Sequence, residues 1–140
     1  MNFNIWHRVS AAAVFLFSSI VFLLTVAPTI SFWDAGEFIT SAVTMGVPHP
    51  PGAPFFQLVG RMLSLLPIGD DLGFRVNLMS TFSSSLTVLF VYLVSMRLLR
   101  QWKGDPKTTL SALTMILSAA SGALILSFSD TFWFNASEAE

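Results

Sequence analysis

The chain has 140 residues, of which 54% are hydrophobic and only 11% are Asp, Glu, Lys or Arg. A soluble domain usually carries about 25% charged residues, so this composition predicts a protein that is solvated by a lipid bilayer. The formal net charge of -1 gives no electrostatic basis for binding a phosphate backbone, and we expect no nucleic acid partner. The sequence has no Cys, which excludes a disulfide framework and a thiolate metal site.

Three stretches that are almost free of charged residues predict three membrane-spanning helices, at about residues 9–30, 76–97 and 108–129. Each reaches or approaches the roughly 20 residues that a helix needs to cross a hydrocarbon core about 30 Å thick. A cleaved signal peptide is an alternative for the first stretch. Its apolar run is longer than the usual stretch of about 7 to 15 residues, however, and it leads into Pro28 and Trp33. The expected fold class is therefore all-α integral membrane.

The basic residues predict the orientation of these helices. Arg8 precedes the first span, and the short link between the second and third spans holds Arg97, Arg100, Lys103 and Lys107. Because Lys and Arg accumulate in cytoplasmic loops, we expect both regions to face the cytoplasm. The N-terminus then lies inside, the C-terminus lies outside, and residues 31–75 form a long outer loop.

Two short helices are expected in this outer loop. The first begins at Asp34 and ends before Gly46, and a proline-rich turn at residues 48–54 follows it. Pro54 suits the first position of the second helix, over residues 55–66.

The second helix is amphipathic, because Gln57, Arg61 and Ser64 form a polar stripe on an otherwise apolar surface. We expect it to lie along the membrane surface with the stripe toward water and the apolar remainder toward lipid.

Four acidic residues are candidates for chemistry. Asp34 and Glu37 are three residues apart on one helical face, where two carboxylates can serve as general base, as metal ligand or as acceptor for sugar hydroxyls. The alternative is structural, with Asp34 as the helix N-cap and Glu37 completing a capping box. Glu138 and Glu140 follow the third span on the same predicted side, and could converge with the first pair or belong to a solvated loop.

Three basic or titratable residues of the outer loop are candidates for substrate binding. His49 can act as a base, a metal ligand or a donor to phosphate, and the alternative is a turn residue among prolines. Arg61 and Arg75 can hold a lipid phosphate. Alternatively, each is an interfacial anchor whose charged end reaches toward water.

The order of these features resembles the GT-C membrane glycosyltransferases. The likeness lies in Phe-Trp-Asp-Ala-Gly-Glu-Phe at residues 32–38, Gly-Val-Pro-His-Pro-Pro-Gly at 46–52, and Phe-Trp-Phe leading into Glu-Ala-Glu at 132–140. It is strongest toward a family first described as a membrane domain of unknown function, whose members include the plexin-type protein O-mannosyltransferases. The resemblance implies that Asp34 is the catalytic base or acceptor activator, that Glu37 assists it, and that His49 lies in the site region. Glu138 and Glu140 would then be a second acidic motif.

The resemblance also implies the substrates and the cellular location. The donor would be a polyprenyl-phosphate-linked sugar, with mannose as the sugar of the O-mannosyltransferase members, and the acceptor would be a protein or glycan hydroxyl. Asp34, Glu138 and Glu140 could hold a divalent cation as cofactor, and the sequence leaves open whether the reaction needs one. The membrane would be the inner membrane in a bacterium or the endoplasmic reticulum in a eukaryote. GT-C enzymes have many more crossings, so we expect residues 1–140 to be the N-terminal part of a larger domain, inactive without the remaining helices.

Two functions of other classes compete with a glycosyltransferase. A non-catalytic scaffold or subunit would use the outer helices to organise partner helices or lipids, with the acids serving only as caps. A transporter is disfavoured, because none of the three predicted spans contains Asp or Glu. Several more hydrophobic segments downstream would favour the enzyme over the scaffold.

Overall fold

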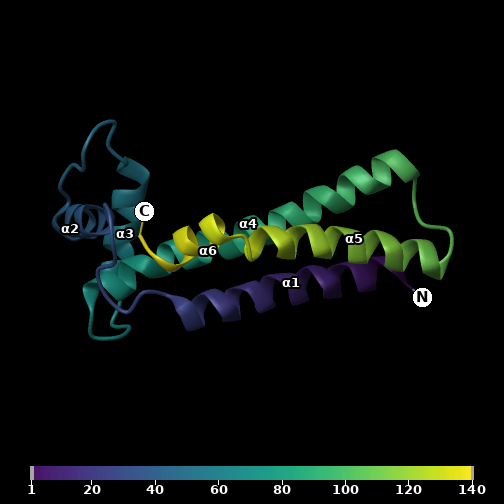
Figure 1. Ribbon diagram of the computed structural model, residues 1–140, viewed down its shortest axis with the longest axis horizontal. Helices are drawn as coiled ribbons and strands as arrows, with labels where there is room; N and C mark the ends of the chain where they lie inside the picture. The colour runs from purple at the N-terminus through teal and green to yellow at the C-terminus, as the bar shows by residue number, and fades with distance from the viewer. Residues whose placement is uncertain (1, 140) are drawn as a thin grey trace.

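The computed structural model describes residues 2–139, and this part of the chain is built from helices without a strand. The helices are α1 (Phe3–Thr25), α2 (Ala35–Thr44), α3 (Pro54–Ser64), α4 (Leu72–Lys103), α5 (Thr109–Ser127) and α6 (Asp130–Ser137). Figure 1 shows α1, α4 and α5 running along the long axis, with α2, α3 and the C-terminus gathered at one end. The N-terminus and the α4–α5 link lie at the other end. The predicted all-α class is confirmed.

Three of the helices, α1, α4 and α5, are long and apolar enough to cross a membrane. The predicted number of spans is therefore confirmed, but the helix ends differ from the predicted edges. α1 stops at Thr25, and α4 runs over 32 residues from Leu72 to Lys103. At about 1.5 Å per residue α4 is about 48 Å long, more than the roughly 30 Å of a hydrocarbon core. The predicted edges differ because they were placed at charged residues. Such residues mark where a helix leaves the hydrocarbon core, but the helix itself can continue beyond them.

Side-chain caps fix where the long helices begin. The Asp71 carboxylate accepts hydrogen bonds from the backbone N–H groups of Gly73 and Phe74, at 2.7 and 3.1 Å, and so starts α4. Thr108 and Ser111 form a reciprocal capping box at the start of α5. The α6 helix was not predicted, and it begins after Ser129.

The core of the bundle depends on small residues on α5. Ala119 and Ala123 are almost fully buried against larger side chains from α1 and α4, including Phe22, Val88 and Tyr92. Small residues allow helix backbones to approach closely, which is how helices associate in lipid. Large apolar side chains are exposed on the outer faces of the three long helices, where lipid would cover them: Val9, Leu16, Ile20, Leu24, Phe90, Val94, Leu98, Leu110, Leu117 and Ile125.

A second, smaller core holds α2 and α3 against the first turns of α4. It contains Ala35, Ile39, Ala42, Val76 and Ala139. The α3 helix approaches α2 so closely at Gly60 that a Cβ atom there would lie 2.9 Å from the Cβ of Ala42. Any larger residue at position 60 would force the two helices apart.

The polar stripe of α3 faces the protein, which contradicts the expectation that it faces water. Gln57 is only 5% exposed, and its Nε2 donates a hydrogen bond of 3.0 Å to the Ser41 hydroxyl on α2. Phe55 and Met62, on the opposite face, are 79% and 69% exposed. The stripe therefore joins α3 to α2, and the apolar face of α3 is exposed.

Candidate active site around helix α2

Asp34 lies at the entrance to α2, directly after a strained residue. Trp33 has a φ of 55° in the left-handed region, which for a bulky side chain costs about 1–3 kcal/mol and persists only where the surrounding structure enforces it. The backbone carbonyl of Asp34 accepts from the N–H of Phe38 at 3.0 Å, which begins the helix. The side chain of Asp34 is exposed.

The structure does not use Asp34 and Glu37 as a capping box. Among the described residues, the Asp34 carboxylate makes no capping hydrogen bond at the start of α2. Glu37 turns instead to His49, so its carboxylate does not reach back to the helix N-terminus. The Asp34 carboxylate is therefore placed at the helix entrance without the capping contact that would have explained it as a structural residue.

Glu37 fastens the proline-rich turn to α2. Its Oε1 accepts from the backbone N–H of His49 at 2.6 Å, and its Oε2 lies 3.1 Å from His49 Nδ1. The His49 ring also packs edge-on against Phe38, with ring centroids 5.6 Å apart. His49 was a candidate base, metal ligand, donor to phosphate or turn residue, and the structure pairs it with Glu37.

The electrostatics of this pair also involve Asp34. The hydrogen bond from the His49 ring is the main reason that the pKa of Glu37 is lowered from its ordinary value. The pKa of His49 is raised, first by the hydrogen bond to Glu37, then by the Glu37 charge, and also by the charge of Asp34. The protonated form of His49 is thus favoured chiefly by Glu37, with a smaller contribution from the charge of Asp34.

Arg61 and Arg75 both donate to backbone carbonyls. Arg61 Nη1 donates to the carbonyl of Val43 near the end of α2, at 2.6 Å. Arg75 donates from Nε and Nη2 to the carbonyls of Ile68 and Gly69 in the α3–α4 link, and from Nη1 to the carbonyl of Ser64 at the end of α3. Both guanidinium groups therefore position the outer segments, and a role in phosphate binding stays a prediction.

Glu138 is 1% exposed and lies beside the link that leads to Asp34, where it accepts a hydrogen bond from the Ser31 hydroxyl. The next residue is held by α4, since the N–H of Ala139 donates to Asn77 Oδ1 at 3.0 Å. Ala139 also packs in the same cluster as Ala35. The two acidic segments, far apart in the sequence, thus meet at α2. Glu140 lies outside the described residues.

The described residues do not by themselves form a metal site. Within residues 2–139, no three His, Asp or Glu side chains gather closely enough to hold a metal ion. Asp34 and Glu138 are therefore not joined by a third ligand from this part of the chain. A divalent-cation role for them stays a prediction.

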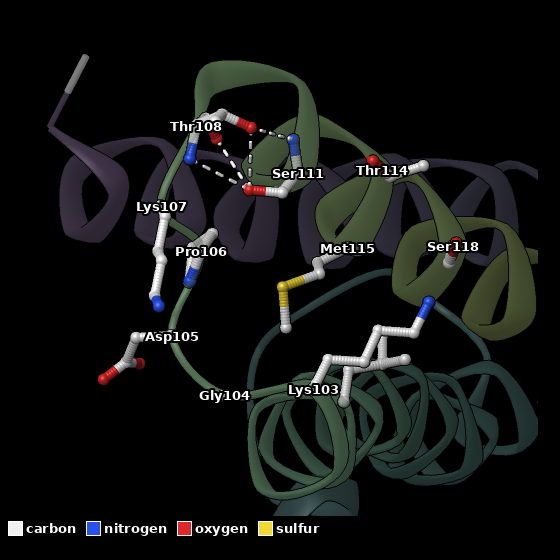
Figure 2. Close-up of a pocket in the computed structure, with 11 residues that line it drawn as sticks. Lys103, Gly104, Asp105, Pro106, Lys107, Thr108, Ser111, Thr114, Met115 and Ser118 are labelled. Carbon is white, nitrogen blue, oxygen red and sulfur yellow. Dashed lines mark hydrogen bonds between the residues drawn. The ribbon is translucent and has the colours of Figure 1, made fainter.

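A cavity of about 420 Å³ adjoins this region, between α2 and the start of α4. Its lining mixes apolar side chains, among them Ile30, Ile39 and Val43, with polar ones that include Asp70 and Asp71. Another cavity, of about 450 Å³, lies at the α4–α5 link (Figure 2). Because that link is at the opposite end of the bundle (Figure 1), this second cavity is not part of the candidate active site.

Asn77 and Asp71 organise the site, and the sequence analysis missed both. Fully buried Asn77 donates from Nδ2 to the carbonyls of Ala27 and Thr29, at 2.9 and 3.0 Å. Asp71 accepts from the Thr29 hydroxyl at 3.0 Å. An Asn within a predicted membrane span and an Asp directly before a helix are the two signals that could have identified them.

Fold and site together define a helical membrane protein with an acidic motif at one end of a three-span bundle. Residues 34–140 match the family model described as "Protein O-mannosyl-transferase TMEM260 N-terminal domain". The chain belongs to this family, and the match begins at Asp34 itself.

Two relatives agree with this assignment. Over 82 residues, 57% of this chain, it is 34% identical to "Protein O-mannosyl-transferase tmem260" of Dictyostelium discoideum. Over 89 residues, 63% of this chain, it is 35% identical to "Protein O-mannosyl-transferase TMEM260" of Mus musculus. The aligned segments cover 10% and 12% of those proteins, so the chain spans about a tenth of the curated relatives that it matches. No solved structure matches the chain.

Proposed function

We propose that this chain is the N-terminal part of a larger membrane glycosyltransferase that moves mannose from a polyprenyl-phosphate-linked donor to a protein hydroxyl. The observation that carries the proposal is the placement of the Asp34 carboxylate. It is exposed at the entrance to α2 and makes no capping contact with the described helix. The relatives' names, which specify protein O-mannosyl transfer, supply the reaction class.

The reaction needs a base at the acceptor hydroxyl. As the acceptor oxygen bonds to C1 of mannose, its proton passes to the Asp34 carboxylate, and the bond between C1 and the phosphate oxygen breaks. The leaving group is the polyprenyl phosphate, which takes the bonding electron pair. A carboxylate near the membrane surface suits a donor whose lipid chain remains in the bilayer.

Neighbouring residues position this base. The Glu37–His49 contact holds the proline-rich turn against α2, and its distances of 2.6 and 3.1 Å fix the turn relative to the helix that Asp34 begins. Glu138 and Asn77 hold the link at residues 27–31, which precedes the strained Trp33. In this proposal Glu37 is a positioning residue, and Asp34 is the catalytic residue.

The proposal places the site on the outer face of the membrane. The basic residues at the α4–α5 link favour the cytoplasm for that end, and α2 lies at the opposite end. The outer face would be the lumenal side of the endoplasmic reticulum in a eukaryote, or the periplasmic side of the inner membrane in a bacterium.

A donor comparison tests the proposed reaction. The full-length protein in nanodiscs receives an acceptor peptide with serine and threonine hydroxyls, and either mannosyl polyprenyl phosphate or a nucleoside-diphosphate mannose as the labelled donor. We expect labelled peptide only with the lipid-linked donor. Transfer from the nucleotide sugar alone would contradict the donor class, and no transfer from either donor would favour a non-catalytic scaffold.

A further inference from the structure

The cavity at the α4–α5 link has a polar entrance built from both helices and the link. Figure 2 shows Lys107 on one side of the view and Lys103 on the other, with Met115 projecting from α5 between them. Thr108 and Ser111 form the adjoining wall, where their capping box fixes the backbone. The entrance therefore combines two flexible cations with a rigid edge.

The charge of this cavity is positive because its one acid is already paired. Arg100 donates from Nε to Asp105 Oδ1 at 2.7 Å, and its Nη2 lies 2.5 Å from the same oxygen. Within residues 2–139, Lys103 and Lys107 form no ion pair. Lys103 Nζ lies 5.3 Å from the centre of the Trp102 ring. Two ammonium groups without an acidic partner among residues 2–139 thus line a cavity of about 450 Å³, where a bound anion would neutralise them.

A second, open and mainly apolar cavity adjoins this entrance on α4 and α5. The adjoining cavity shares Leu99 and Ser118 with the first, and extends between Leu98, Trp102 and Ala119. The exposed Trp102 indole lies at the end of α4, and indole rings favour the layer between headgroups and acyl chains. The groove is therefore cationic beside the α4–α5 link and mainly apolar further along the two helices.

We propose that this α4–α5 groove binds one anionic phospholipid, with its headgroup phosphate on Lys103 and Lys107 and an acyl chain along Leu98, Leu99 and Ala119. Basic pockets between membrane helices recognise acidic headgroups in this way. The apolar continuation selects a lipid over free phosphate, which would use only the entrance. The groove lies at the opposite end of the bundle from Asp34, so this proposal does not depend on the proposed function.

Photo-crosslinking tests the proposal in the full-length protein. Nanodiscs of phosphatidylcholine carry a trace of phosphatidylserine or phosphatidylcholine with a diazirine on the acyl chain, and adducts are mapped by peptide mass spectrometry. We expect phosphatidylserine adducts on the peptides that contain residues 98–102 and 118–119. Unlabelled phosphatidylserine should compete for this labelling, and inorganic phosphate should not.

Two double variants with equal loss of charge separate a site from a general surface potential. Lys103→Gln with Lys107→Gln should weaken the apparent affinity about 25-fold at low ionic strength, at about fivefold per lysine. Arg8→Gln with Arg97→Gln also removes two charges from this end of the bundle, but neither residue lines the groove. This control should change the affinity at most a few-fold.

Three results would overturn the proposal. Equal labelling by the phosphatidylcholine probe would show nonselective lipid contact. Competition by inorganic phosphate would show a soluble anion site, and equal losses in the two double variants would show a general surface potential.

Discussion

Gly60 offers a direct test of how α2 and α3 are packed. In Gly60→Ala the added Cβ would lie 2.9 Å from the Cβ of Ala42, closer than two carbon atoms can pack. Such overpacking of a core costs about 1–3 kcal/mol. Against this, alanine in a helix interior is about 1 kcal/mol more favourable than glycine.

Gly122→Ala is the matched control, because it gains the same helix propensity but its added Cβ meets no neighbouring side chain among residues 2–139. Gly122 lies on α5, and no described atom is within 4 Å of its added Cβ beyond its own helix backbone and chain neighbours. Subtracting one variant from the other cancels helix propensity. Gly60→Ala should therefore be less stable than Gly122→Ala by about 1–3 kcal/mol.

Equilibrium unfolding in mixed micelles measures this difference in the full-length protein, with a fluorophore on a cysteine at exposed position 62 as the local probe. In an Ala42→Gly background the clash is gone, so adding Gly60→Ala should no longer lower stability. Equal stabilities of Gly60→Ala and Gly122→Ala would refute the close approach of the two helices.

Three further predictions concern the contacts around the site and the orientation of the bundle. In Glu37→Gln the pKa of His49, measured by histidine NMR, should fall toward its ordinary 6.5, because the carboxylate that raises it is gone. The Glu37–His49 pair should stabilise the folded state fully between pH 4.5 and 6.5, the ordinary pKa values of the two groups. This stabilisation should be lost as pH rises through the raised pKa of His49 or falls through the lowered pKa of Glu37. Asn77→Leu leaves buried carbonyls without a donor and should cost about 1–3 kcal/mol in unfolding experiments, whereas exposed Thr87→Val, which loses only a bond within its own helix, should change stability by less than about 0.5 kcal/mol. Cysteines at positions 70 and 105 should react with a membrane-impermeant thiol reagent from opposite sides, and labelling of both from one side would reject the three-span topology.

The fold could be predicted from the sequence wherever a local signal determined it. The three spans followed from apolar length, and α2 and α3 followed from glycine and proline positions. The face that α3 turns toward the protein could not be predicted in this way, because Gln57 bonds to Ser41, a residue on α2. An amphipathic pattern locates a polar face, but it does not say whether water or a neighbouring helix covers that face.

In the candidate site, too, the residues could be predicted from the sequence but their contacts could not. The sequence identified Asp34, Glu37 and His49 as separate candidates, because residue type and spacing are local information. It could not predict that Glu37 binds His49, since this contact depends on how the proline-rich turn folds back. The burial of Glu138 likewise results from packing against residues 107 positions away.

The rate of mannosyl transfer by the Asp34→Asn variant tests the central claim most directly. Asn keeps the size of the side chain and removes the base, and Asp130→Asn makes the same change at an exposed acid on α6. We predict that full-length Asp34→Asn inserts and folds normally but loses about two orders of magnitude or more in transfer rate, the scale of general-base removal. Asp130→Asn should keep its activity. Transfer at the wild-type rate by a folded Asp34→Asn protein would contradict the assignment of Asp34 as the catalytic base.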